Sequence, residues 1–245
     1  MDQPEIIGQY LVSSTFLRGA GMTLLITIVS VLLGIIVGLI IAIMQETRNS
    51  VLGAIVVVYL WLFRGTPVLF QIIFVFNVLP SFGILLSGFT SAVLALCLNE
   101  GAYMAEILRS GLQAVGRGQR TAGSALGLRD WQVMRYIVLP QAARIVIPPI
   151  GNQFIGMLKL SALVSVIAVE ELLLVANQVA SSNFLYLEAL TAAGIYYLIF
   201  TTVFMMCQAR IERWAAGRRG KRAAVRKVSF TQRLLGVTGG DTRIR

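Results

Sequence analysis

The sequence contains no histidine and only two cysteines among its 245 residues, and charged residues make up 13% of it. Without histidine, neither a Ser-His-Asp triad nor a Cys-His pair can form. The two thiols, Cys97 and Cys207, lie in separate apolar stretches, so they do not make a zinc cluster. These absences exclude most hydrolase active sites, and we expect no metal site and no enzyme activity in this chain.

Hydrophobic residues, by contrast, make up 57% of the chain, and the mean hydropathy of +0.79 is well above that of an ordinary soluble domain. Several apolar runs reach about 20 residues, the length at which a helix crosses roughly 30 Å of hydrocarbon. We therefore predict an all-α integral membrane protein. Its five transmembrane helices are expected over residues 21–44, 51–79, 89–108, 145–176 and 187–206.

Two of these runs, 51–79 and 145–176, are longer than one straight crossing requires. In the first, Pro67 removes a backbone donor and Arg64 is long enough to reach an interface, so we expect a break there. The half before the break should be interfacial or kinked, and the half after it should cross the membrane and end near Pro80. The second run should bend or surface at its proline and charged positions, which are Pro148, Pro149, Lys159, Glu170 and Glu171.

The net charge of +10 does not indicate a nucleic-acid partner, because the basic residues are not interleaved with aromatics on a folded face. They collect in residues 109–144 and in residues 210–245, and the second stretch holds eleven of them. Under the positive-inside rule both stretches face the cytoplasm, which puts the N-terminus outside and the C-terminus inside. We expect a transmembrane domain over residues 1–214 and a basic cytoplasmic tail over residues 215–245.

The polar stretch 111–141 carries a pattern with defined spacing. It reads Thr121-Ala122-Gly123, three residues, Gly127, nine residues, and then Ile137-Val138-Leu139-Pro140. We expect residues 122–128 to form an exposed helix, with Gly127 at positive φ near its end. The pattern resembles the EAA motif of ABC importer permeases, which has glutamate at the position of Thr121 and a second alanine at that of Gly123.

Other segments resemble the polar amino-acid branch of that family, the histidine, glutamine and arginine type permeases, over nearly the whole chain up to Trp214. In chain order they are Phe63-Arg64-Gly65-Thr66-Pro67, Gly101-Ala102-Tyr103-Met104-Ala105-Glu106, Gly118-Gln119, Asn152-Gln153-Phe154-Ile155, Leu158-Lys159 and Ser165-Val166-Ile167. Leu160 and Ala162 depart from the branch, which usually has polar residues there.

The resemblance implies a type I ABC importer permease fold in the bacterial inner membrane and a complex that imports polar amino acids. In such a complex two permease subunits, identical or paralogous, join an ABC ATPase dimer and an extracytoplasmic amino-acid-binding protein. ATP and magnesium bind to the partner ATPase. This chain has no P-loop sequence, so we expect it to bind no cofactor.

A short helix on a cytoplasmic loop can dock in a cleft of a soluble partner and follow its closure as a rigid body. We predict that the ATPase docks on Gln119, Thr121, Ala122, Gly123, Ser124, Leu126, Gly127, Leu128 and Arg129. The plainer interpretation is a charged inner loop that only sets the orientation of the chain. The preserved spacing of the motif favours docking.

Polar residues at membrane depth are candidates for the substrate pathway, because a free amino acid carries an ammonium and a carboxylate that lose water there. The candidates are Asn99, Glu100 and Tyr103 in the third span, with Lys159 and Glu170 in the fourth. Glu100 would meet the ammonium, and Lys159 would meet the carboxylate. An alternative of equal weight is that these groups pair with one another or with backbone and hold broken helices together.

Two further charged features have plain interpretations. Glu106 and Arg109, three residues apart, are interpreted as an ion pair within one helix. Arg64 is as easily explained by a kink with a long interfacial side chain as by a contact with substrate.

Other kinds of transport protein are alternatives. A secondary transporter would also bury Glu100 and Lys159, but it usually shows paired repeats, which five spans cannot supply evenly. A channel would need no ATPase.

Overall fold

A computed structural model describes residues 3–47 and 49–216, so most of the predicted basic tail lies outside the described residues. The described part contains helices and loops and no strand. The α-helices are α1 (Gln3–Val12), α2 (Ser14–Glu46), α3 (Ser50–Gly65), α4 (Val68–Asn77), α5 (Gly88–Ala114), α6 (Arg117–Ala125), α7 (Asp130–Gln132), α8 (Leu139–Leu160), α9 (Leu172–Asn183) and α10 (Tyr186–Ala216). Two 3-10 helices, η1 (Leu79–Phe82) and η3 (Ser161–Ile167), and a π-helical stretch, η2 (Val133–Val138), connect them.

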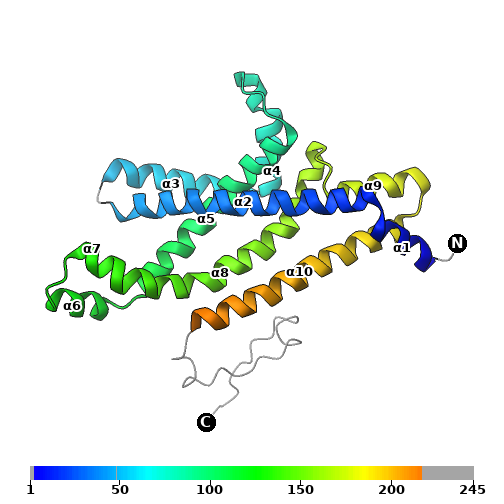
Figure 1. Cartoon of the computed structure of the whole chain (residues 1–245). Helices are drawn as coiled ribbons and strands as arrows, with labels where there is room; N and C mark the ends of the chain where they lie inside the picture. Colours follow the sequence, from blue (N-terminus) through cyan, green and yellow to red (C-terminus); the bar gives the residue numbers. More distant parts are fainter. Residues whose placement is uncertain (1–2, 48, 217–245) are drawn as a thin grey trace, which may run out of the picture.

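Four helical segments of the described chain are long and apolar enough to cross a membrane. They are Ser14–Glu46, Gly88–Ala114, Asp130–Ile167 and Tyr186–Arg213, and the bent pair of α3 and α4 makes a fifth if it counts as one span. The chain is therefore a multi-pass membrane protein. α6 and α7 lie at one end of the long helices, and α1 and α9 lie at the other (Figure 1).

The α2–α5 contact is the most extensive in the fold, and two glycines of α2 explain how close the helices come. A Cβ on Gly34 would lie 2.7 Å from Cγ of Glu100, and a Cβ on Gly38 would lie 2.5 Å from Cβ of Met104. These positions are one helical turn apart on both helices, so the two helices run in the same direction. Gly34 and Gly38 have the small-xxx-small spacing of closely packed helices, and this spacing brings α2 against α5.

The break predicted at Pro67 is confirmed, because α3 ends at Gly65, α4 begins at Val68 and their axes differ by 104°. Thr66 is extended (φ −116°, ψ 147°), which is the conformation that a following proline favours. The prediction for the second half is wrong. α4 has 10 residues and rises only about 15 Å, half of what a crossing needs.

The second long run, residues 145–176, breaks later than its prolines. Pro148 and Pro149 both lie inside α8, so neither ends the helix. α8 ends at Leu160 and is followed by η3, and the residue after η3, Ala168, is in the left-handed region (φ 58°). The bends expected near Lys159 and at Glu170-Glu171 are confirmed, and Pro148 and Pro149 do not interrupt α8.

A second core forms where α1, α9 and α10 meet the start of α2. It contains Phe16 of α2, Leu172 and Ala176 of α9, and Ala189 and Ala192 of α10, all fully buried. The hydroxyl of Tyr196 on α10 donates to the carbonyl of Leu11 at 2.6 Å and ties α1 to this core. The amide of Asn183 on α9 also donates to the hydroxyl of Tyr10 on α1 at 2.6 Å. This end of the bundle is therefore fixed by packing of small residues and by long-range hydrogen bonds.

Candidate transport and coupling sites

α6 is the helix of the EAA-like motif, and its bounds differ from the prediction. It covers Arg117–Ala125, whereas the sequence predicted residues 122–128. The helix starts five residues earlier than predicted, at Arg117, and ends at Ala125, before Gly127. Gly127 follows it at φ +79°, so the predicted positive φ is confirmed, and the amide of Leu128 donates to the carbonyl of Gly123 at 3.2 Å.

Gly123 is the point at which α6 packs against η2. A Cβ at this position would lie 2.7 Å from Cδ1 of Ile137 and 3.0 Å from Cγ2 of Val133, both on η2. The guanidinium of Arg120 also donates inward, to the carbonyl of Leu112 at 3.3 Å. A glycine where the motif has alanine therefore lets α6 lie directly on η2, and the two elements make one platform.

The predicted docking residues divide by exposure. Gln119, Thr121, Ala122, Ser124, Leu126, Gly127 and Arg129 are exposed, Leu128 is half-buried and Gly123 is buried. The Thr121 hydroxyl donates to the carbonyl of Arg117 at 3.2 Å, so the residue that replaces the motif glutamate bonds to its own helix. Gly123 thus supports the platform from beneath, while the others form its outer surface.

Trp131 and Tyr136, which the sequence analysis did not single out, enlarge this surface beside the predicted residue Leu126. Leu126 is 81% exposed, and the rings of Trp131 and Tyr136, 6.2 Å apart, are both exposed. Large apolar groups on a charged loop are unusual unless another surface covers them. For Trp131 and Tyr136, the position shortly after Gly127 in the motif was the available signal.

Glu100 is buried where three helices meet. Its side chain lies against Gly34 of α2, and the amide of Gln153 on α8 donates to Oε1 at 3.3 Å. Gln153 belongs to the segment that carries the family resemblance, although we did not predict it as a partner of Glu100. The carboxylate is therefore held between α2, α5 and α8.

Asn99, beside Glu100, is buried on another side of α5. Its Nδ2 donates to the carbonyl of Phe63 at 3.0 Å and to Oε1 of Gln71 at 3.1 Å. Gln71 was missed from the sequence, although it is the one carboxamide in α4 apart from Asn77 at the helix end. Asn99 thus contacts the break between α3 and α4.

Tyr103 is exposed on the same helix and lies beneath a cation. The guanidinium carbon of Arg64 is 5.7 Å from the centroid of its ring, and the guanidinium forms an ion pair with Glu106. The predicted pair between Glu106 and Arg109 is wrong. The α3 helix runs alongside α5, so the long Arg64 side chain reaches Glu106 across Tyr103, and the pair joins two helices.

Lys159 and Glu170 are both exposed, and the structure does not bring either to Glu100. The buried carboxylate of this region is the neighbouring Glu171, which is fully buried. It caps α9 by accepting from the amides of Leu173 and Leu174, and it also accepts from the hydroxyl of Tyr197 at 3.0 Å. The five candidate pathway residues therefore do not form one cluster.

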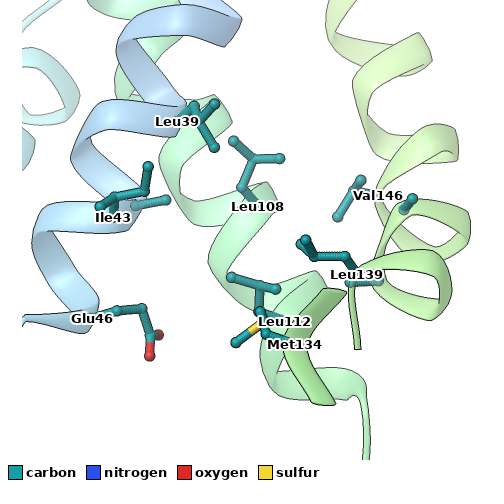
Figure 2. A pocket seen from close by; sticks show the side chains of 11 residues that line it. Leu39, Ile43, Glu46, Leu108, Leu112, Met134, Leu139 and Val146 are labelled. Carbon is teal, nitrogen blue, oxygen red and sulfur yellow. The ribbon is translucent and has the colours of Figure 1, made fainter. Parts of the chain in front are cut away.

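An apolar cavity of about 480 Å³ lies between α2, α5 and the start of α8 (Figure 2). Leu39, Leu108 and Val146 are among its lining residues, and Glu46 lies at one end. None of the five candidate pathway residues lines it. Its hydrocarbon wall offers no partner to a zwitterion, so it does not suit a free amino acid. Within residues 3–47 and 49–216, no three Cys, Asp or Glu side chains gather as metal ligands.

Comparisons with known proteins agree with this geometry. The chain matches the family described as binding-protein-dependent transport system inner membrane component over residues 31–217. It is 39% identical over 219 residues to the arginine transport system permease protein ArgU of Corynebacterium glutamicum, covering 83% of this chain and 69% of that protein. It is 37% identical over 199 residues to the glutamine transport system permease protein GlnP of Escherichia coli, covering 80% and 91%.

Solved structures share the fold. A chain of the structure described as an amino acid ABC transporter with histidines superposes with a TM-score of 0.81 at 36% identity, covering 87% of this chain and 98% of that one. A chain of the inward-facing MetNI methionine ABC transporter gives a TM-score of 0.71 at 20% identity, which bears on the fold alone. The family match extends over most of the chain, and two relatives exceed 30% identity over at least four-fifths of it. The chain therefore belongs to the family of binding-protein-dependent transport system inner membrane components, the permease subunits of ABC importers.

Proposed function

We propose that this chain is the permease subunit of an importer that moves polar amino acids across the bacterial inner membrane. The observation that carries the proposal is the similarity to arginine and glutamine permeases over at least 80% of the chain. The platform of α6 and η2 supports it, because the fold leaves a rigid, exposed surface beside the membrane domain.

An ABC ATPase dimer would dock on the outer surface of that platform. Leu126, Trp131 and Tyr136 supply exposed apolar area, and Arg129 supplies charge. Because Gly123 packs on η2, a movement of α6 would carry η2 and the continuous α8 with it. ATP and magnesium would bind to the ATPase and not to this chain. An extracytoplasmic amino-acid-binding protein and a second permease subunit, identical or paralogous, complete the proposed complex.

The proposed topology has five spans, with α3 and α4 together as the second. The N-terminus and α9 lie outside, and the α6–η2 platform and the C-terminus lie inside. Four arginines of the platform stretch, Arg117, Arg120, Arg129 and Arg135, support this orientation under the positive-inside rule. α1 and α9 lie at the opposite end of the long helices from α6 (Figure 1).

A topology test uses cysteine labelling on the Cys207→Ser background in sealed, right-side-out vesicles. Reagent added outside should modify a cysteine at Gly83 and should not modify one at Arg120. Permeabilised vesicles are the control, in which both should react. Modification of the Arg120 position in sealed vesicles would overturn the orientation.

Function is tested by co-expressing the full chain with an ABC ATPase and an amino-acid-binding protein from the same genome, and reconstituting the complex in proteoliposomes. Uptake of radiolabelled arginine, glutamine and histidine should require ATP inside the vesicles, which is the side that the ATPase faces. It should also require the binding protein. Uptake that continues without ATP would indicate a secondary transporter or a channel and would overturn the proposal.

A further inference from the structure

The break between α3 and α4 leaves one backbone carbonyl without its helical donor. In a continuous helix, the carbonyl of Phe63 would accept from the N–H of the residue four positions on, which here is Pro67. Proline has no N–H, and Thr66 is extended, so the helix cannot supply this bond. The carbonyl of Thr66 lies in the same break, beyond the last turn of α3.

Two side-chain amides donate to these carbonyls. Nε2 of Gln71 lies 3.0 Å from the carbonyl oxygen of Phe63 and 3.1 Å from that of Thr66. Nδ2 of Asn99 lies 3.0 Å from the same Phe63 oxygen and 3.1 Å from Oε1 of Gln71. One carboxamide thus comes from α4, the other comes from α5, and they bond to each other as well as to the break.

Burial makes these bonds difficult to replace. Gln71 is 6% exposed and Asn99 is 2% exposed, so water does not reach them freely. A primary amide has two hydrogens to donate, and both hydrogens of Asn99 are used within this group. Asn99 therefore has no donor left for a substrate. Loss of Asn99 would leave the buried Oε1 of Gln71 without this donor, and loss of Gln71 would leave the Thr66 carbonyl without its side-chain donor. In either case the Phe63 carbonyl would keep one of its two donors.

We propose that Gln71 and Asn99 are positioning residues that replace the hydrogen bond missing at Pro67 and fix the bent α3–α4 pair against α5. We call this pair of carboxamides the amide clasp. By holding the end of α3, the clasp also keeps Arg64 above Tyr103 and in its ion pair with Glu106. The clasp itself stands on these contacts, and only its effect on transport rests on the proposed function.

Spin-label distances test the clasp directly in the full chain in nanodiscs. Labels replace Ala54 on α3 and Asn77 on α4, both exposed, on the Cys207→Ser background; Cys97 is buried and stays. At 1.5 Å per residue, a 104° bend puts these Cα atoms about 21 Å apart and a continuous helix puts them about 35 Å apart. Singly labelled chains identify any distances between copies.

The variants are Asn99→Leu, Gln71→Leu, and each combined with Pro67→Ala. Asn99→Leu and Gln71→Leu should each broaden the distance distribution and lower the Tm by roughly 5 °C or more, because the first removes the donor to Oε1 of Gln71 and the second removes the donor to Thr66. Adding Pro67→Ala should recover most of the Tm of Gln71→Leu, because a helix that continues through residue 67 supplies backbone N–H donors to both Phe63 and Thr66. It should recover part of the Tm of Asn99→Leu, because Phe63 regains a second donor, and in both it should move the distance toward the longer value. Asn177→Leu, the same change at an exposed position of α9, should change neither measurement.

Transport separates this role from a ligand role. In the reconstituted importer, Asn99→Leu should lower the maximal rate with little change in KM, and Pro67→Ala should not restore that rate, because the bend is lost. An unchanged distance and Tm together with a raised KM would make Asn99 a substrate ligand and overturn the clasp. The clasp would also be overturned if Pro67→Ala raised the Tm of neither Leu variant. If neither the unmodified chain nor any variant transports, the proposed function fails, and the distance and Tm results still decide the clasp.

Discussion

Gly34 on α2 and Glu100 on α5 lie in direct contact, so that the absence of a side chain at one position makes room for a carboxylate at the other. A Cβ on Gly34 would lie 2.7 Å from Cγ and 2.8 Å from Cβ of Glu100. One turn further along, Gly38 meets Met104 in the same way. A Cβ added to Gly38 would also lie 2.9 Å from the backbone nitrogen of Ala105. The polar centre of α5 is therefore placed by the glycines of α2.

This contact predicts the effect of a single methyl group. Gly38→Ala should destabilise the protein by about 1–3 kcal/mol, because the α5 backbone must move away to admit the new Cβ. Gly53→Ala on α3 is the matched control, since nothing lies within 4 Å of its added Cβ, and it should be neutral or slightly stabilising. Thermal unfolding of the purified chain in nanodiscs measures both. An equal Tm for the two variants would contradict the close approach of α2 and α5.

Adjacent glutamates offer a second matched comparison. Glu171 is fully buried, and it accepts from the amides of Leu173 and Leu174 at the start of α9, whereas Glu170 is exposed. Glu171→Gln keeps the size but gives up one acceptor oxygen, and should cost about 1–3 kcal/mol. Glu170→Gln should leave the Tm unchanged. A larger loss at Glu170 than at Glu171 would mean that the turn before α9 is placed incorrectly.

Several features of the fold could be predicted from the sequence alone. The break at Pro67 and the positive φ at Gly127 were predictable, because each follows from the covalent structure of one residue. The spacing of Gly34 and Gly38 was also sufficient, since a helix puts such residues on one face. Local chemistry decided these features.

Other features depend on contacts between distant segments. Glu106 has Arg109 one turn away, yet it pairs with Arg64, because α3 lies alongside α5. Glu170 and Glu171 are equivalent in sequence, and the left-handed turn at Ala168 decides which of them is buried. One acceptor for Asn99 is the backbone carbonyl of Phe63, 36 residues away, which the break leaves without its helical donor, and hydropathy does not reveal this contact.

The platform leads to a prediction about coupling. Gly127 has φ +79° and no atom within 4 Å of an added Cβ, so strain and not crowding would limit its replacement. Gly127→Val should reduce ATPase stimulation and uptake at least about tenfold while the subunit still inserts, because a β-branched residue disfavours that φ. Gly127→Asn should be milder, since asparagine tolerates the left-handed region.

The control for Gly127 is Gly118→Val, which is also exposed and open but has an ordinary helical φ within α6. It should retain most of the ATPase stimulation. Full activity of Gly127→Val, measured as substrate-stimulated ATP hydrolysis in proteoliposomes, would count against docking on this platform.

The last prediction concerns the charged groups of the substrate pathway. Glu100 is 2% exposed between α2, α5 and α8, and its one described side-chain donor is the neutral amide of Gln153, so the carboxylate is not neutralised by a cation there. A substrate ammonium would supply that cation, and loss of such a charge-assisted hydrogen bond should slow transport about tenfold or more. We therefore expect Glu100→Gln to lower the rate of uptake or to change which amino acid is preferred, with assembly and Tm retained because the amide has the same size.

Lys159 is exposed, and Lys159→Met should alter uptake only if Lys159 meets the substrate carboxylate. Glu46→Gln, an exposed change at the end of α2, is the control and should transport normally. A fall in expression or Tm with normal uptake per assembled complex would assign Glu100 to structure. Unchanged rate and selectivity in both Glu100→Gln and Lys159→Met would remove these two residues from the pathway.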